Sequence, residues 1–459
     1  MSERSEVFDV LVVGAGVVGT AIGRELAHRD LRVGLVDAAE DVGTGTSKAN
    51  TAILHTGFDA TPGTLEARLV ARGHDLLGGY AAAAGIAVER TGALLVAWDD
   101  EQLAVLPTLQ AKAERNGYRA TRLVGVGELY EREPHLGPGA CGALEVPGES
   151  IVDPWSPPIA FATEAVAGGV ELLLGTRVTG VRVGPPHRLV TTRGELAARH
   201  VVNVAGLFSD VLDRWFRRDG FTVTPRRGEL LVYDKLARPL VRHVLLPVPT
   251  KLGKGVLVAP TVFGNVLLGP TAEDVVDRTD TGSTAAGLAF LRDRGARILP
   301  ELLDEEVTNV YAGLRAATEH GDYQLRGYPE QGYVCVGGIR STGLTASMAI
   351  AEHVVRLLAE GGLRTPPRAG AVTPSMPPLG EEQRRPFQRA DLVAADPAYG
   401  QVVCHCERVT LGEIRDAQQG PLAAGDLDGL RRRTRALNGR CQGFYCGAAV
   451  TSLLGANHG

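Results

Sequence analysis

The sequence predicts a mixed α/β and α+β protein with a parallel-sheet domain, an interleaved β-rich domain and a small cysteine-rich domain at the C-terminus. Three observations predict this organisation: a glycine-rich turn after the first apolar run, two blocks of short strands between further strand–glycine–helix units, and four of the six cysteines within the last 56 residues. A chain of 459 residues has room for roughly two to four domains with buried cores.

The first α/β unit lies at the N-terminus. The apolar run Val7–Val13 predicts a strand buried on both faces, followed by a helix to about His28 and a second strand at Arg32–Val36. The turn between strand and helix is a GxGxxG of the Rossmann-like dinucleotide type: Gly14 allows the tight turn, Gly16 lets the backbone approach a pyrophosphate, and Gly19 lets helix and strand pack closely. Asp37 closes the second strand, where a carboxylate accepts hydrogen bonds from an adenosine ribose. The alternative is a tight turn with a purely structural role.

Strand and turn signals divide the rest of the chain. Further strands are predicted at Val170–Val183, Leu196–Gly206 and from Tyr333 into a helix ending near Leu358, with shorter ones at Leu94–Ala97, Gly228–Tyr233, Gly255–Val258 and Asn265–Gly269. We therefore expect the Rossmann-like domain at 1–84, 151–220 and 321–363, and a β-rich domain that covers the substrate at 85–150 and 221–320. Residues 364–400 are rich in proline and predict a semi-rigid linker, and 401–459 form the last domain.

Composition excludes several classes of protein. The net charge is −5, from 48 basic and 53 acidic residues, and aromatic residues make up 5%, which argues against nucleic-acid binding. No apolar stretch reaches the length of a transmembrane helix, and the first residues lack the basic start of a signal peptide. Six cysteines in so long a chain are no disulfide framework, so a reducing compartment is favoured. We expect a cytoplasmic protein, with peripheral contact at the inner face of the membrane left open.

The C-terminal cysteines are spaced as metal ligands. Cys404 and Cys406 form CxC, and Cys441 and Cys446 form CxxxxC after 34 intervening residues, with a basic helix predicted between the pairs at Leu427–Asn438. Four thiolates have the right number and softness for a 2Fe–2S cluster. A structural zinc ion on the same thiolates and a metal-free domain are the alternatives, although zinc ribbons usually pair two CxxC knuckles.

Three segments, Gly45–Ala60, Val201–Asp210 and Gly337–Val354, resemble the flavin-contacting segments of the D-amino-acid-oxidase-like FAD-dependent oxidoreductases, in the same order and spacing. The resemblance spans about residues 7 to 360 and implies that the cofactor is FAD. It implies that the flavin nucleotide is bound by the three glycines and Asp37 together with Thr46, Ser47, Val178, Gly206, Gly338, Gly343, Leu344 and Thr345. The last three of these open a helix whose N–H groups stabilise negative charge on the reduced flavin.

A closer resemblance links TSKANTAILHTGFDATPGTLEARL, GKGVLVAPTVFGNVLLGPTAED and YAGLRA to the branch of anaerobic-type glycerol-3-phosphate dehydrogenase large subunits. It implies that Arg315 holds the substrate's anionic end, and we expect His55 to act as general base and Lys254, in the KLGK pair with Lys251, to bind phosphate. His55 as a purely flavin-binding residue, Arg315 as a structural ion pair and the lysines as a solvated loop are the alternatives. YAGLRAATE lacks the proline that often follows GLR in this branch, which leaves the substrate open. The cysteine tail resembles a bacterioferritin-associated-ferredoxin-like 2Fe–2S domain.

Together these features predict a FAD-dependent dehydrogenase that oxidises a small anionic secondary alcohol. The first-choice substrate is sn-glycerol 3-phosphate, yielding dihydroxyacetone phosphate, with electrons passing through the cluster to a partner protein or quinone-linked subunit. One alternative is oxidation of a 2-hydroxy acid such as L-2-hydroxyglutarate, or of an amine or imino acid. Another is a flavin and iron–sulfur electron-transfer subunit whose substrate site lies on a different chain.

Overall fold

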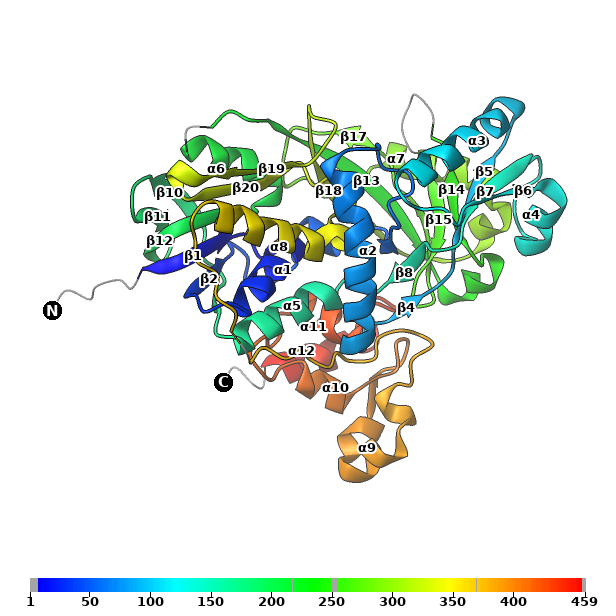
Figure 1. Cartoon of the computed structure of the whole chain (residues 1–459). Coiled ribbons are helices and arrows are strands. Elements are labelled where there is room, and N and C mark those ends of the chain that lie inside the picture. Colours follow the sequence, from blue (N-terminus) through cyan, green and yellow to red (C-terminus); the bar gives the residue numbers. More distant parts are fainter. Residues whose placement is uncertain (1–6, 217, 250–254, 369, 456–459) are drawn as a thin grey trace.

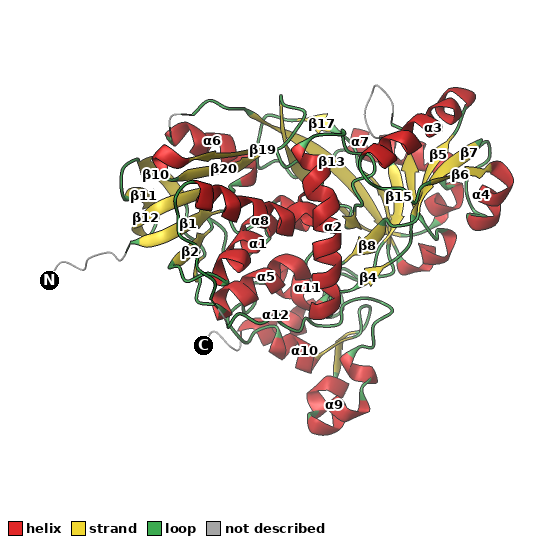
Figure 2. Cartoon of the chain, viewed as in Figure 1, coloured by secondary structure: helices red, strands yellow, loops and turns green. Residues whose placement is uncertain are grey.

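The computed structural model describes residues 7–216, 218–249, 255–368 and 370–455. Two large sheets lie side by side, several helices pack between and around them, and the C-terminal residues form a separate lobe beneath both (Figure 1). Coloured by secondary structure, the helices cluster over the first sheet and the second sheet is more open (Figure 2).

The first sheet contains the N-terminal α/β unit. Its strands are β1 (Phe8–Val13), β2 (Val33–Val36), β9 (Glu171–Leu173), β10 (Val178–Arg182), β11 (His187–Thr191), β12 (Gly194–Asn203), β19 (Gln324–Tyr328) and β20 (Tyr333–Gly337). Their order is β10-β11-β12-β1-β2-β9, and β20 pairs with the second half of β12 and carries β19. The central strands β2, β1, β12 and β20 are parallel, so their carboxyl ends meet at one edge, where open α/β sheets bind ligands.

Helices of different lengths cover this sheet. They are α1 (Val17–Ala27), α2 (Leu65–Ala84), α5 (Ser156–Ala167), the short α6 (Ser209–Trp215) and α8 (Gly343–Glu360), with 3₁₀ turns η1 (Thr46–Lys48), η2 (Gly206–Phe208) and η5 (Pro329–Gln331). Helix α1 packs against both α5 and α8, and α2 packs against α8. Their apolar faces and the central strands form one core that includes Val10, Ile22 and Ile350, all fully buried. Predicted strands and helices of this region are confirmed, and α8 begins at Gly343 as expected.

The second sheet is built from two separate stretches of the chain. Its strands are β5 (Ala93–Ala97), β6 (Arg122–Gly125), β7 (Gly142–Val146), β13 (Val223–Tyr233), β14 (Val244–Pro247), β15 (Leu257–Pro260), β16 (Val266–Gly269), β17 (Glu273–Asp274) and β18 (Val307–Thr318). The order is β17-β13-β16-β15-β14-β5-β7-β6, with β18 on the other side of β13. The predicted strand Gly228–Tyr233 is longer than expected, because β13 starts at Val223 and pairs with β18 over its whole length.

Smaller elements complete this half of the molecule. Helices α3 (Asp100–Arg115), α4 (Val126–Arg132) and α7 (Ala285–Ile298) and the 3₁₀ turns η3 (Lys235–Leu240) and η4 (Pro300–Asp304) flank the second sheet, and β3 (Ile53–Leu54), β8 (Ser150–Val152) and β4 (Val88–Glu89) form a small sheet between the two halves.

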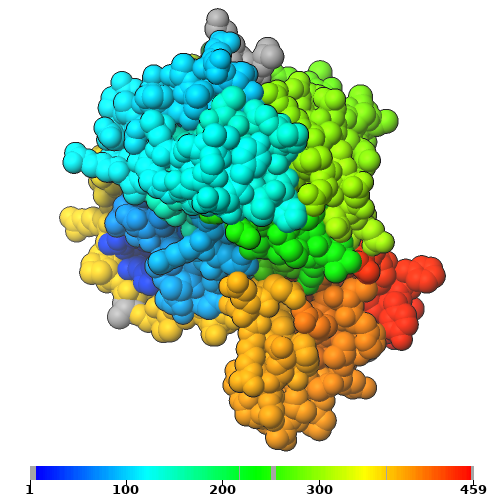
Figure 3. Space-filling model, turned by 90° about the vertical axis from the view of Figure 1, so that its right-hand side faces the viewer, coloured from blue at the N-terminus to red at the C-terminus, as the bar shows by residue number. Residues whose placement is uncertain are grey.

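The proline-rich segment leads along the body to the C-terminal lobe. It is held there by backbone hydrogen bonds that the amides of Arg368, Met376 and Glu381 donate to His28, Ala84 and Val262, and it then forms η6 (Pro386–Gln388), α9 (Ala390–Ala395) and η7 (Pro397–Gly400). The lobe contains β21 (Val402–Cys404), β22 (Val409–Thr410), α10 (Leu411–Asp416), α11 (Leu427–Thr434) and α12 (Gly447–Gly455) around a small core of its own. In the space-filling view it projects below the body, against the green and blue surfaces (Figure 3).

Two further findings bear on sequence expectations. The basic helix predicted at Leu427–Asn438 ends at Thr434, because Arg435 adopts a left-handed conformation with φ of 69°. Within the described ranges, no helix has both the length and the apolar character needed to cross a membrane.

Candidate active site and cysteine cluster

A cavity of about 1550 Å³ lies between the two sheets and reaches from the first glycine-rich turn to β13 and β18. Its wall includes twelve of the residues that the sequence singled out. His55 and Arg315 lie nearer the second sheet, and the other ten lie at the nucleotide end and the flavin edge: Gly14, Gly16, Gly19, Asp37, Thr46, Ser47, Val178, Gly206, Gly343 and Leu344. Segments far apart in the sequence therefore meet on one site.

The glycine-rich turn is shaped to receive a phosphate group. Gly14 has φ of +117°, and a Cβ there would lie 2.5 Å from the Val204 carbonyl oxygen, while a Cβ at Gly19 would lie 1.8 Å from the Gly14 carbonyl oxygen. These two positions therefore accept no other residue without a shift of the backbone. Helix α1 starts directly after Gly16, so its free N–H groups and positive dipole end face the cavity. This cradle fits the pyrophosphate of a dinucleotide.

Polar side chains hold the loops around the cradle. Asp37 ends β2, and its carboxylate accepts hydrogen bonds from the amides of Ala15 at 2.6 Å and Ala39 at 2.8 Å. Ser47 Oγ accepts a hydrogen bond from the Val17 amide at 2.9 Å, and Thr46 Oγ1 donates to the Leu314 carbonyl at 2.8 Å. The turn η1 is thereby tied to the start of α1 on one side and to β18 on the other.

His55 is paired with a buried carboxylate. Its Nδ1 lies 2.9 Å from Glu149 Oε2, and Oε1 of the same carboxylate accepts hydrogen bonds from the Thr56 amide at 2.7 Å and the Thr56 hydroxyl at 2.8 Å. The Glu149 side chain is completely buried. A carboxylate that already accepts hydrogen bonds from Thr56 holds Nδ1 of His55 as a donor, which leaves Nε2 as the ring nitrogen that can accept a proton. This arrangement suits a general base.

Two guanidinium groups lie at the opposite end of the cavity. Arg226 on β13 and Arg315 on β18 are directly opposed in the sheet register and both line the cavity. Arg226 is held by Asp274 at 2.6 and 3.1 Å, whereas Arg315 donates only to the Thr271 carbonyl, at 3.3 Å, and no carboxylate of the described residues pairs with it. Burial lowers the pKa of Arg315, and the charge of Arg226 lowers it further. Like charges opposed across strands are unfavourable, so an anion placed between them would be stabilised.

Gly228 leaves room for the Arg315 side chain. A Cβ at this position would lie 2.9 Å from Nη2 and 3.0 Å from Nη1 of Arg315. We expect Gly228→Ala to displace the guanidinium at a small cost in stability, since the two nearest atoms belong to the end of a flexible side chain and the third, the Cβ of Pro270 at 3.0 Å, has to move by only a few tenths of an ångström. The kcat/KM for an anionic substrate should fall about 10- to 100-fold while the melting temperature stays nearly unchanged. Steady-state kinetics and thermal unfolding of the same preparation measure both; an unaltered kcat/KM would contradict the placement of Arg315.

Two predicted residues of the described part of the chain are not part of the cavity wall. Gly338 is buried beside Gln324 and Thr318. Thr345 is buried in α8, where its hydroxyl accepts a hydrogen bond from the His55 amide at 3.1 Å and donates to the Ile53 carbonyl, so it positions the His55 loop. Lys254, like Lys251, lies outside the described residues.

The four C-terminal cysteines gather in pairs. Cys406 and Cys441 contact each other through their side chains, and so do Cys404 and Cys446. Within the described part of the chain, no three metal-ligating side chains converge as they would around one ion. The four thiols supply the number and kind of ligands that a 2Fe–2S cluster takes.

The electrostatics of these thiols also fit a cationic cluster. Burial raises the pKa of Cys406, and burial together with the charge of Cys404 raises the pKa of Cys446 to about 12. The backbone N–H groups of Tyr445, Gly443 and Phe444 point at the Cys441 sulfur and lower the pKa of that thiol. Thiols whose pKa is raised, as at Cys406 and Cys446, are deprotonated when a metal supplies the positive charge.

Sequence reasoning did not find two residues of this site. Glu149 lies in the turn before β8, in the stretch PGES, and only its burial beside His55 reveals its importance. Arg226 precedes the strand that was predicted at Gly228–Tyr233, so its place opposite Arg315 follows from the true start of β13. The one sequence signal for Arg226 was that it is a polar residue within a longer stretch of strand-like sequence.

Comparisons with known proteins agree with this geometry. Residues 9–357 match the family described as FAD dependent oxidoreductase (DAO), and residues 402–456 match the BFD-like 2Fe–2S binding domain. The chain is 35% identical over 457 residues to a glycerol 3-phosphate dehydrogenase from Caloramator mitchellensis, covering 97% of this chain and 94% of that protein. It is 31% identical to a glycerol 3-phosphate oxidase from Mycoplasma pneumoniae, over 77% of this chain and 95% of the oxidase.

The structural likeness points the same way. L-α-glycerophosphate oxidase from Mycoplasma pneumoniae, solved with FAD bound, superposes with a TM-score of 0.75 at 28% identity and covers 80% of this chain and 98% of its own. These matches confirm the family resemblance and both cofactors that the sequence indicated. The chain belongs to the DAO family of FAD-dependent oxidoreductases and carries a BFD-like 2Fe–2S domain at its C-terminus.

Proposed function

We propose that this enzyme oxidises sn-glycerol 3-phosphate to dihydroxyacetone phosphate. The observation that carries the proposal is the cavity itself, which has a dinucleotide cradle at one end and, nearer the second sheet, an imidazole–carboxylate pair and two opposed guanidinium groups. The substrate offers matching chemistry, since it has a secondary hydroxyl close to a phosphate. The glycerol 3-phosphate dehydrogenase and oxidase among the relatives support the same substrate.

Each residue of the site has a distinct part in this reaction. Arg315 binds the phosphate through two N–H groups, and Arg226 adds a second positive charge beside it. His55 accepts the hydroxyl proton on Nε2 as the carbonyl forms, and Glu149 holds the ring in the tautomer that can do so. Bound FAD supplies the acceptor for the hydride that leaves the carbinol carbon, and the 2Fe–2S cluster carries electrons onward singly.

The alignments support a dehydrogenase rather than an oxidase. The Mycoplasma pneumoniae oxidase is matched over 95% of its length yet covers only 77% of this chain, whereas the Caloramator dehydrogenase is matched along nearly the whole of both chains. The 2Fe–2S domain occupies residues 402–456, toward the end of this chain. An electron carrier of this kind has a use when electrons go to a partner protein or a quinone-linked acceptor, and little use if dioxygen reoxidises the flavin directly.

The same reasoning extends to the enzyme's surroundings. We propose a cytoplasmic location, in which the cluster thiolates stay reduced, with peripheral contact at the inner face of the membrane when the acceptor is quinone-linked. The six cysteines, all described, form no disulfide, which supports a reducing compartment.

An anaerobic absorbance titration tests the proposal. Adding sn-glycerol 3-phosphate to the purified enzyme should bleach the flavin band and then the bands of the iron–sulfur cluster. L-2-hydroxyglutarate and glycerol serve as controls, since the first lacks the phosphate and the second lacks any anion. Bleaching by L-2-hydroxyglutarate alone would indicate that the substrate is a 2-hydroxy acid and not sn-glycerol 3-phosphate. Absence of bleaching by all three would indicate that the substrate site needs another chain.

A further inference from the structure

The C-terminal domain is attached to the flavin domain by buried ion pairs. Asp41, in the loop after β2, accepts two hydrogen bonds from Arg433, at 2.7 and 2.8 Å, and pairs with Arg432 as well. Burial on its own would raise the pKa of Asp41, but the hydrogen bond and charge of Arg433 and the charge of Arg432 outweigh it and hold the pKa below its ordinary value. All three side chains are at most 8% exposed. Such pairs favour one orientation of the two partners, because any other leaves buried charge uncompensated.

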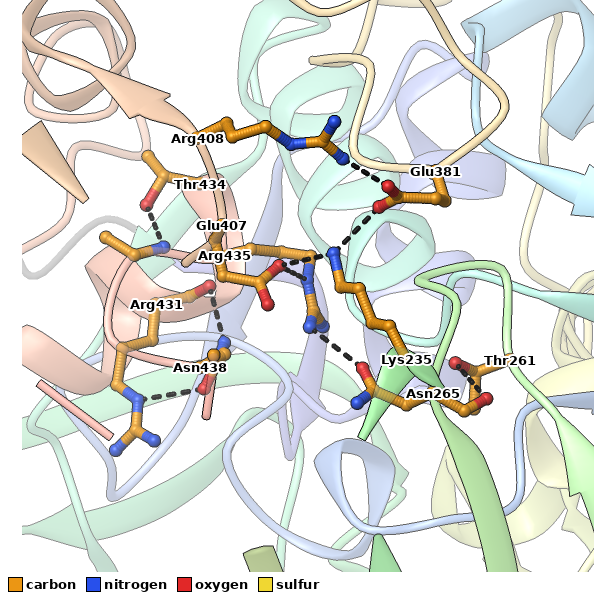
Figure 4. Close-up of polar contacts among 12 residues, drawn as sticks. Lys235, Thr261, Asn265, Glu381, Glu407, Arg408, Arg431, Thr434, Arg435 and Asn438 are labelled. Atoms are coloured by element: carbon orange, nitrogen blue, oxygen red, sulfur yellow. Dashed lines mark hydrogen bonds and ion pairs between the residues drawn. The ribbon is translucent and has the colours of Figure 1, made fainter. Parts of the chain in front are cut away.

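A second ion-pair network joins three further segments of the chain (Figure 4). Glu407 of the cysteine loop lies between Arg435, at 2.8 Å, and Lys235 of η3, at 3.3 Å. Lys235 also binds Glu381 of the proline-rich segment at 2.7 Å, and Glu381 in turn pairs with Arg408. Arg435 donates at 3.3 Å to Asn265 in the turn between β15 and β16. The domain is therefore fixed against both halves of the molecule.

Arg435 also contacts aromatic rings of the flavin and substrate domains. Its guanidinium carbon lies 4.0 Å from the centroid of Phe263 and 5.7 Å from that of Trp155, and these two rings are stacked at 5.2 Å. A desolvated cation over aromatic rings is strongly held. The Arg435 side chain is thus held by its ion pair with Glu407 and by its contacts with two aromatic rings.

The stacked Trp155 ring also contacts η1, the 3₁₀ turn that contains the predicted flavin-binding residues Thr46 and Ser47. Trp155 Nε1 donates to the carbonyl of Lys48 at 3.2 Å, and Lys48 is the last residue of η1, next to Ser47, which binds the start of α1. The Lys48 ammonium pairs with Asp428 of the C-terminal domain at 2.9 Å. At the other end, Glu407 directly follows Cys406. A continuous set of contacts therefore runs from the flavin-binding turn through Trp155 and Arg435 to the cysteine loop.

We propose that Trp155 and Arg435 are positioning residues that hold residues 404–407, which include Cys404 and Cys406, against the 3₁₀ turn η1. We further propose that electrons pass between the two cofactors across this fixed contact. The inference rests on the proposed function for the source of the electrons. With both cofactors bound, the hydride from the alcohol would bring two electrons to the flavin, and these would pass singly to the cluster. The proton that came with the hydride would return to solvent, and a one-electron acceptor protein or a quinone would reoxidise the cluster between the two transfers. The domain is docked during transfer and does not travel between sites.

Rapid mixing of holoenzyme variants tests the contact. Trp155→Leu removes the ring and its hydrogen bond to Lys48, and Trp155→Phe keeps an aromatic ring. Trp98→Leu is the matched control, because Trp98 also lies under an arginine, Arg297 of α7 at 5.2 Å, but in the turn between β5 and α3, away from the interface. After anaerobic mixing with sn-glycerol 3-phosphate, we expect flavin bleaching at the wild-type rate in all three. Cluster reduction should be about 10- to 100-fold slower in Trp155→Leu, near normal in Trp155→Phe, and normal in Trp98→Leu.

Two further readouts isolate the contact from the cofactors themselves. Dithionite, which reaches the cluster directly, should reduce it equally fast in every variant. Amide hydrogen exchange should increase in Trp155→Leu at residues 46–48 and 404–407 only. Normal cluster reduction in Trp155→Leu overturns the inference, and so does a flavin bleaching rate that falls as much as the cluster rate.

The same variants separate this inference from the proposed function. If sn-glycerol 3-phosphate fails to bleach even the wild-type flavin, the flavin is instead reduced by light with EDTA, and the transfer to the cluster is followed from there. A slow second step in Trp155→Leu under those conditions supports the contact even when the substrate assignment has failed. An equally fast second step refutes it whatever the substrate is.

Discussion

Replacing His55 with glutamine is expected to lower the rate of flavin reduction by sn-glycerol 3-phosphate about 10²- to 10⁴-fold, the range observed when a general base is lost. Glutamine still donates a hydrogen bond to Glu149, so the buried carboxylate keeps a partner, but no atom of the new side chain accepts the hydroxyl proton. The substrate affinity should change little, since the phosphate contacts lie elsewhere. Anaerobic stopped-flow absorbance at several substrate concentrations gives the limiting rate and the apparent affinity separately.

The control for this change acts on the partner of His55. In Glu149→Gln the amide can present an N–H to Nδ1, which favours the opposite tautomer and removes the basic lone pair from Nε2, so the limiting rate should fall as well. A structural role would predict a lower melting temperature with an unchanged pH profile, whereas the positioning role predicts an altered pH profile. An undiminished limiting rate in His55→Gln would remove His55 from the chemistry.

Replacing Arg315 with methionine is expected to lower kcat/KM for sn-glycerol 3-phosphate about 10²- to 10³-fold, as for the loss of one partner of a buried, hydrogen-bonded charge pair. Protein stability should not fall with it. Burial already disfavours the charged form of Arg315, and no carboxylate of the described residues compensates that charge, so an apolar side chain of similar length relieves a cost of folding. A large kinetic loss with an equal or higher melting temperature is therefore the signature expected of a residue kept for binding.

Two companion variants sharpen the result. Arg226→Met should cost less, because Arg226 is about half exposed and already paired with Asp274. Arg315→Lys keeps the charge but loses the two-pronged geometry, and should recover only part of the loss. The preference for sn-glycerol 3-phosphate over glycerol should shrink in Arg315→Met. If the preference is unchanged, the phosphate is held elsewhere.

The parts of this structure that depend on local sequence were predictable. The GxGxxG turn requires its glycines for reasons within a single strand–turn–helix unit, and the structure places Gly14 and Gly19 where a Cβ would collide with backbone. The four cysteines are recognisable by type and spacing, and the structure brings them together. Both features constrain the chain over short distances, so one sequence carries the signal.

The parts that depend on tertiary pairing were not predictable. Glu149 acquires its role because a turn before β8 is brought beside His55, and nothing in the local pattern marks it. Thr345 was expected at the flavin as part of a helix N-terminus, and the sequence did not indicate that its side chain on α8 also holds the His55 loop. Arg433 of α11 pairs with Asp41, and Arg435, just after the helix, contacts Glu407 and Trp155. These partners lie far away in the sequence, so the local pattern could not predict the contacts.

The opposed arginines also bear on which changes in length the protein can tolerate. Arg226 and Arg315 share a face because β13 and β18 pair without a shift from Val223 to Val232, and side chains alternate between faces at every residue. One residue inserted or deleted in either strand between these arginines and the rest of the ladder would turn one guanidinium away from the cavity. Loops at the mouth can lengthen or shorten without this effect. Under the proposed function, recognition of the substrate's anionic group is therefore far more sensitive to a single-residue deletion in β13 or β18 than to longer insertions in the loops around them.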